Sequence, residues 1–148
     1  MRHFRTGKIP ANVLARNVFR YTGKKDPSVV LGSSIGEDAA LVAIGDNILV
    51  LKTDPITGTA SDIGWHSVHI NANDVACRGA RPRWFLCDLL LPERSDALLV
   101  DRIMRQVDRG AREIGVAIVG GHTEVTPNLT RPIVAGYMVG IVSRKRFV

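Results

Sequence analysis

The chain has 148 residues, of which 45% are hydrophobic and only 5% aromatic, so one globular domain with an aliphatic core is expected. No apolar run is long enough for a signal peptide or a membrane-spanning helix, which predicts a cytoplasmic protein that does not enter a membrane. The net charge is +6, but no aromatic residues lie between the scattered arginines, which argues against dedicated nucleic-acid binding.

Hydrophobic periodicity and turn residues divide the chain into helices and strands. The predicted elements, in chain order, are a helix over residues 11–22, a hairpin of strands 39–44 and 47–54, a helix over 61–79, a strand over 81–92, a helix over 96–114, and strands over 116–121 and 132–142. Gly45 and Asp46 favour a tight hairpin turn. Ser61 or Asp62 could cap the second helix, and Ser95 the third. This order predicts an α+β fold, with a mostly antiparallel sheet and helices on one face.

Two features of the composition have structural explanations. Cys77 and Cys87 form no CxxC pair and lie among apolar neighbours, so both are predicted to be buried, reduced and structural. The arginines of the third helix recur opposite its apolar side, which predicts a solvated face.

Acidic residues occur where buried elements meet loops. Asp38 directly precedes the first hairpin strand and Asp54 ends the second, so the hairpin should bring these two carboxylates together. Asp74 lies on the second helix, on one stripe with Ser67 and Asn71. Carboxylates that converge without a matching Lys or Arg repel each other, and Mg²⁺ carrying nucleotide phosphates would relieve the repulsion. The pattern therefore predicts a magnesium–nucleotide site that includes Asp38, with ordinary turn chemistry as the alternative.

The segment after the predicted strand 116–121 adds a second group of polar residues. Adjacent Gly120 and Gly121 allow a backbone conformation that presents N–H groups to an anion. His122 and Glu124 follow directly, in a predicted loop.

Four ordered motifs, GEDAALV, LKTDP, NANDVACRGARP and VGGHTEV, resemble the ATP-binding amino-terminal half of the aminoimidazole ribonucleotide synthetase (PurM-like) superfamily over residues 8–143. That group includes thiamine-monophosphate kinase, selenophosphate synthetase and the carbamoyl dehydratase of hydrogenase maturation. The motifs are most similar to those of hydrogenase-maturation (HypE-like) members and AIR synthase-related proteins. The resemblance implies a small sheet that pairs with its twin in a homodimer. It also implies that ATP lies across the dimer, with Mg²⁺ on its phosphates.

The resemblance further implies roles for individual residues. Those expected to contact ATP or its phosphates are Asn71, Gly120, Gly121, His122 and Thr123. Those expected to bind metal are Asp38, Asp54 and Asp74, with Glu124 as a further carboxylate. His122 is a departure, because several kinases of the family have Asp there and histidine is a poor ligand for Mg²⁺. A loop histidine bonded to the backbone is the alternative for this residue.

The implied function is a magnesium-dependent ATP-binding domain of an enzyme that activates an amide, carbonyl or phosphate oxygen by phosphoryl transfer. Family members continue into a second domain that completes the substrate pocket, whereas here residues 144–148 are a basic tail without a structural pattern. The resemblance thus implies a further domain or a partner subunit. The alternatives are a non-catalytic domain of the same fold that dimerises and binds a nucleotide or partner, and a basic nucleic-acid-binding module.

Overall fold

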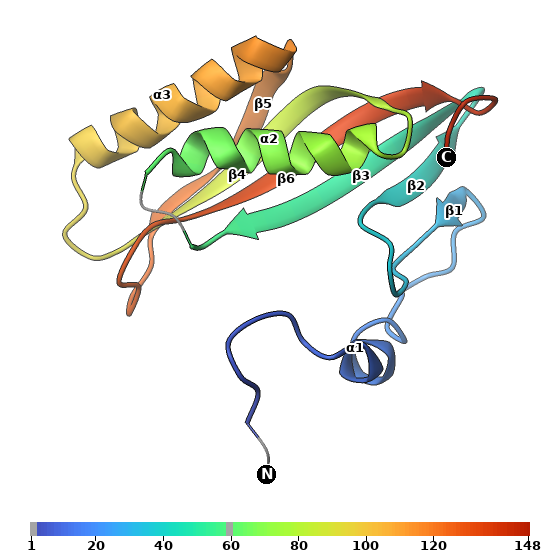
Figure 1. Ribbon diagram of the computed structural model, residues 1–148, viewed down its shortest axis with the longest axis horizontal. Helices are drawn as coiled ribbons and strands as arrows, with labels where there is room; N and C mark the ends of the chain where they lie inside the picture. Colours follow the sequence, from blue (N-terminus) through green and yellow to red (C-terminus); the bar gives the residue numbers. More distant parts are fainter. Residues whose placement is uncertain (1–2, 59–60) are drawn as a thin grey trace.

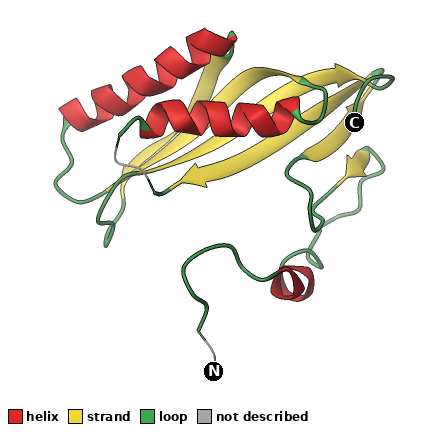
Figure 2. Ribbon diagram, in the orientation of Figure 1, coloured by secondary structure: helices red, strands yellow, loops and turns green. Residues whose placement is uncertain are grey.

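The computed structural model describes residues 3–58 and 61–148, and in them six strands form one sheet in the order β1-β2-β3-β6-β4-β5 (Figure 1, Figure 2). The elements are α1 (Ala11–Asn17), β1 (Val29–Leu31), β2 (Ala40–Ile44), β3 (Asn47–Ile56), α2 (Ile63–Ala76), β4 (Arg81–Leu91), α3 (Ala97–Ile114), β5 (Ala117–Val125) and β6 (Ile133–Ser143). Neighbouring strands are antiparallel except β4 and β5, which are parallel. The predicted α+β fold with a mostly antiparallel sheet is confirmed.

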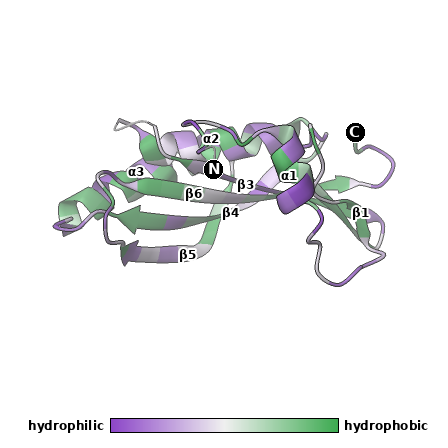
Figure 3. Ribbon diagram, turned by 90° about the horizontal axis from the view of Figure 1, so that it is seen from below, coloured by the Kyte–Doolittle hydropathy of each residue, from purple (hydrophilic) through white to green (hydrophobic). Residues whose placement is uncertain are grey.

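Helices α2 and α3 cover one face of the sheet (Figure 1, Figure 3). Alternate residues of the central strands point to this face and form the core with the apolar stripes of both helices. The largest fully buried apolar side chains are Ile48, Val50, Val68, Val75, Phe85, Leu89, Ile103, Val107, Val134 and Met138. In the described part of the chain no helix packs on the opposite face, which we call the open face. The sheet therefore has one dry face and one uncovered face.

Two glycines of β6 allow α2 to lie directly on the sheet. A Cβ atom on Gly136 would lie 2.5 Å from Asn71 Nδ2, and one on Gly140 would lie 2.3 Å from Val75 Cγ1. Any side chain at either position would push the helix away from the sheet. This close approach brings the polar side chains of α2 down to the backbone of the neighbouring strand β3.

The hairpin is confirmed, but the amino-terminal segment differs from the prediction. Ile44 pairs with Asn47 across the two-residue turn. Helix α1 ends at Asn17 instead of residue 22, and it buries no residue. A short helix gains little stability when none of its faces packs against the core, even if its apolar residues recur at helical spacing. This explains why α1 ends early. Strand β1 was not predicted, because its three residues are too few to show a period.

The helix ends also differ from the prediction. Asp62 precedes α2, but its side chain makes no capping bond and pairs with Arg109 at 2.7 Å. Helix α3 is capped by Asp96, which accepts a 2.9 Å hydrogen bond from the N–H of Leu99. The predicted cap, Ser95, instead donates to the carbonyl of Pro92.

The outer face of α3 is solvated, as predicted, and two of its arginines, Arg105 and Arg112, pair along the helix with Asp101 and Asp108. The carboxyl-terminal residues are not free of structure, because Phe147 packs against the core and the N–H of Val148 donates to the carbonyl of Arg78. Among the described residues, no helix has the length and hydropathy needed to cross a membrane.

Candidate functional site

Two of the predicted acids converge on a lysine that the sequence analysis did not consider. Lys52 Nζ lies 2.8 Å from Asp74 Oδ2 and 3.3 Å from Asp54 Oδ2. Burial lowers the pKa of Lys52, but its hydrogen bond to Asp74 and the charges of both carboxylates outweigh burial, so the net pKa is raised. The ammonium is therefore charged at neutral pH, and the premise that these carboxylates lack a cationic partner is wrong. We call these three residues the Lys52 cluster.

Asn71 fixes the backbone of one member of the cluster. Its Nδ2 donates to the carbonyl oxygens of Ser67, at 2.8 Å, and Asp54, at 3.3 Å. Its Oδ1 accepts a 2.8 Å hydrogen bond from the N–H of Asp54. The side chain is 0% exposed. Within this chain Asn71 positions Asp54, and its contact with ATP stays a prediction.

Asp38 lies in the loop before β2, at the same end of the hairpin as Asp54. The β2–β3 ladder ends at this side with Ala40 opposite Leu51, so Asp38 lies just beyond it. Its side chain is exposed and makes no hydrogen bond or ion pair within the described residues. The adjacent Glu37 pairs with Arg78, just beyond the end of α2, which ties the loop to the helix. The hairpin thus places Asp38 near the cluster but not in contact with it.

The segment Gly120–Glu124 is part of strand β5 and not a turn followed by a loop, so this part of the prediction is wrong. Its parallel pairing with β4 continues to Val125. Gly121 has φ of 149°, and a Cβ atom there would lie 1.9 Å from the carbonyl oxygen of Cys87. The need for glycine at this position is therefore explained by the close approach of β4.

His122 is bonded to a side chain, not to the backbone. Its Nε2 lies 3.1 Å from Glu124 Oε2, and Thr126 Oγ1 donates to Glu124 Oε1 at 2.7 Å. The Thr126 hydrogen bond, followed by that of His122, lowers the pKa of Glu124. Glu124 is thus an ionised partner of His122 in an exposed strand. The neighbouring Thr123 is also exposed and pairs with Leu89 in the ladder.

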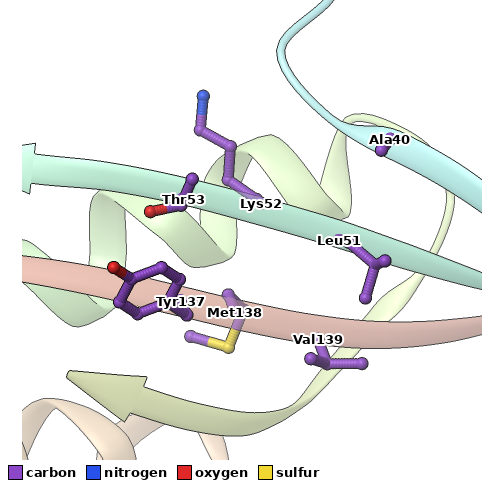
Figure 4. A pocket seen from close by; sticks show the side chains of 7 residues that line it. All are labelled: Ala40, Leu51, Lys52, Thr53, Tyr137, Met138 and Val139. Atoms are coloured by element: carbon purple, nitrogen blue, oxygen red, sulfur yellow. The ribbon is translucent and has the colours of Figure 1, made fainter. Parts of the chain in front are cut away.

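The open face has two depressions that share Tyr137. One, of about 370 Å³, is lined by Ala40, Leu51, Lys52, Thr53, Tyr137, Met138 and Val139 (Figure 4). The other, also of about 370 Å³, is lined by Leu86, Asp88, Gly121, His122 and Tyr137. Tyr137 Oη donates to Asp88 Oδ2 at 3.0 Å, and this bond together with the charge of Asp88 raises the pKa of Tyr137. Neither residue was predicted from the sequence, although the alternation along β4 places Asp88 on the other face of the strand from the buried Phe85 and Cys87.

The two groups of predicted site residues lie apart in one chain. Across the sheet, Asp54 pairs with Gly136, Gly136 with Cys87, and Cys87 with Gly121. Three strand spacings separate the acid from the glycine, or about 14 Å. A single copy of the sheet therefore does not bring the acids and the glycine segment into direct contact.

The Lys52 cluster fits a metal site in which phosphate and water supply part of the ligands better than a site made of protein ligands alone. No group of three or more His, Cys, Asp or Glu side chains in residues 3–58 and 61–148 is placed to hold a metal ion. The oxygen donors of Asp54 and Asp74 nevertheless have the chemistry that Mg²⁺ prefers, and they are 41% and 24% exposed. Mg²⁺ commonly takes one or two carboxylates and completes its shell with phosphate and water oxygens.

The cysteines lie in different environments. Cys87 is buried, and burial together with the charge of Asp88 raises the pKa of its thiol to about 11. Cys77 is exposed, so its predicted burial is wrong.

The family model for the AIR synthase related protein, N-terminal domain, matches residues 36–142. The chain belongs to this family. Every predicted site residue lies inside the matched range of this AIR synthase-related domain, whereas α1 and β1 lie outside it.

The domain is similar to parts of larger proteins. It is 31% identical over 147 residues to phosphoribosylformylglycinamidine cyclo-ligase of Thermococcus kodakarensis, covering 91% of this chain and 42% of that protein. The structure of AaThiL complexed with AMPPCP and TMP matches with a TM-score of 0.68 and 29% identity, over 79% of this chain and 39% of the other. A chain of the HypE–HypF complex matches with a TM-score of 0.66 and 27% identity, over 75% and 38%. The AIR synthase-related domain thus spans about two fifths of these relatives.

Proposed function

We propose that this AIR synthase-related domain binds ATP with Mg²⁺ and is the nucleotide-binding part of an enzyme that activates an amide, carbonyl or phosphate oxygen by phosphoryl transfer. The main support for the proposal is the Lys52 cluster, which has two partly exposed carboxylates, that of Asp54 at the end of the hairpin and that of Asp74 on α2. The similarity to AaThiL, whose structure contains the ATP analogue AMPPCP, supports a nucleotide as the ligand.

The residues of the chain contribute mainly by position and charge. Asp54 and Asp74 offer oxygen ligands, and the exposed Asp38 is free to add a third. Bound Mg²⁺ would neutralise charge on the phosphates, which is the principal requirement of phosphoryl transfer. Hydrogen bonds from Asn71 hold the backbone of Asp54, so that its carboxylate would keep its position when Mg²⁺ binds.

We propose that the glycine segment of one copy of the chain contacts the phosphates of a nucleotide bound at the acids of a second copy. Strands β6 and β4 lie between this segment and the acids, about 14 Å across three strand spacings, so one copy of the chain does not bring both groups to the same phosphates. The open face supports this arrangement, because it exposes apolar side chains that a twin sheet would cover. Half-buried apolar residues there are Val42, Leu49, Leu51, Leu86, Val139 and Ile141.

Sedimentation tests the homodimer. The parent should sediment as a dimer at micromolar concentration, and Leu51→Glu should make it a monomer, because the new charge lies on the open face. Leu98→Glu is the matched control, since Leu98 is 77% exposed on helix α3 and its replacement should leave the dimer intact. A monomeric parent would contradict the proposal.

Calorimetric titration of AMPPCP with and without Mg²⁺ tests the ligand. Saturable binding should require Mg²⁺, and Asp74→Asn should weaken it about tenfold or more because one charged ligand is lost. Asp101→Asn, on the outer face of α3, should bind as the parent does. No binding to the parent with Mg²⁺ present would reject nucleotide binding. Substrate turnover by the domain joined to its further domain or partner subunit would separate the enzyme from the non-catalytic alternative.

A further inference from the structure

We propose that Lys52 is a resident counter-ion that keeps free divalent cations out of the acid pair, so that metal enters only together with a nucleotide. This inference deepens the proposed function and rests on it. It assigns a positioning and selectivity role to a residue that lies between the two carboxylates and touches both.

The contacts place the ammonium where a cation would be held. One nitrogen atom contacts an oxygen of Asp54 and an oxygen of Asp74. A free divalent ion that approaches these oxygens meets a positive charge already in place, and like charges at such short range repel strongly. The first barrier to metal binding is therefore the displacement of Lys52.

The exposure of the three side chains indicates which of them a ligand from solvent reaches first. The side chain of Lys52 is only 8% exposed, whereas that of Asp54 is 41% exposed and that of Asp74 is 24% exposed. A ligand from solvent thus reaches the carboxylates before it reaches the ammonium. Phosphate oxygens arriving with a metal offer the ammonium a replacement partner, which a hydrated metal ion alone does not.

A purely structural role explains the lysine less well. Ile48, Val50 and Ile56 occupy the same face of β3 and are buried against the helices. An apolar residue at position 52 would continue this pattern, and a buried ion pair commonly adds less stability than apolar packing of similar volume. The lysine is better explained by a function of its charge.

Metal binding without nucleotide tests the inference directly. Mn²⁺ serves as the probe, and its binding to the parent, K52M and K52R is measured by electron paramagnetic resonance in the absence of nucleotide. The parent and K52R should bind weakly, and K52M should bind about tenfold more tightly or better, because the competing charge is removed. K145M, at an exposed position in the tail, should behave as the parent does.

Two further outcomes decide between the alternatives. Equal Mn²⁺ affinity of parent and K52M would overturn the role of Lys52, whatever the nucleotide does. Tighter binding by K52M, in a parent that does not bind AMPPCP with Mg²⁺, would keep the role of Lys52 and reject the proposed function. If circular dichroism shows that K52M does not fold, K52Q replaces it with the same expected gain and the same contradicting result.

Discussion

The Lys52 cluster and the glycine segment of β5 contain residues of the same proposed site, but the chain builds them differently. The cluster lies between β3 and α2, and the buried amide of Asn71 fixes its backbone. The glycine segment lies in an edge strand whose residues from Gly120 to Val125 are all exposed.

The difference indicates which part of the proposed site is positioned by the packing of one chain. Core packing of α2 against Gly136 and Gly140 sets the position of the acids, so their geometry is part of the fold. On β5 Gly121 fits the close approach of β4, while the exposed side chains of the segment remain open to a partner or ligand.

The largest expected effect is at Gly121. Gly121→Ala should lower the free energy of unfolding by about 3 kcal/mol, because its Cβ atom would meet the carbonyl of Cys87 and its φ is unfavourable for alanine. Gly120→Ala is the control, since its Cβ atom would make an ordinary 3.6 Å contact with Leu86, and it should change stability by no more than about 1 kcal/mol. Denaturant unfolding measures both. Equal losses would show that β5 does not require glycine through its contact with β4.

The second effect is at Asn71. Asn71→Ala should cost about 2 kcal/mol, because the partly buried N–H and C=O of Asp54 lose their side-chain partner. Asn73→Ala, exposed on the same helix, should stay within about 0.5 kcal/mol of the parent. The same unfolding experiment compares them. If the two variants were equally stable, Asn71 would not be the residue that fixes the cluster.

The smallest effects are at the cysteines. Cys87→Ala should cost about 1 kcal/mol as a small core truncation, and Cys77→Ala should cost nearly nothing because Cys77 is exposed. At pH 8 a thiol reagent should label Cys77 in the native protein, while Cys87, whose thiol has a pKa raised to about 11, should react only after unfolding. Rapid native labelling of Cys87 would contradict its burial.

The sequence predicted the parts of the fold that depend on periodicity. The hairpin at Gly45 and Asp46 and the strands β4 and β6 follow from alternation and turn chemistry. Strand β5 was cut short because the two glycines resembled a turn, whereas the parallel pairing with β4 carries the strand through them. Tertiary pairing of this kind is not visible in local composition.

The site was predicted less completely for a related reason. Asp38, Asp54 and Asp74 were singled out because acidic residues beside buried segments are conspicuous, and their binding of metal stays a prediction. Lys52 was missed because a lysine in a strand is usually an exposed residue, and only the packing of α2 on β3 shows that it pairs with two acids.

We propose that these acids bind Mg²⁺ with a nucleotide, and Asp38→Asn separates metal binding from turn chemistry because the exposed side chain of Asp38 has no partner within the described residues. Melting curves of the parent and Asp38→Asn should coincide without ligand. With Mg²⁺ and AMPPCP the melting temperature of the parent should rise by mass action, and that of the variant should rise much less, because a metal ligand is lost. Equal rises in both proteins would contradict metal binding by Asp38 and leave it as a turn residue.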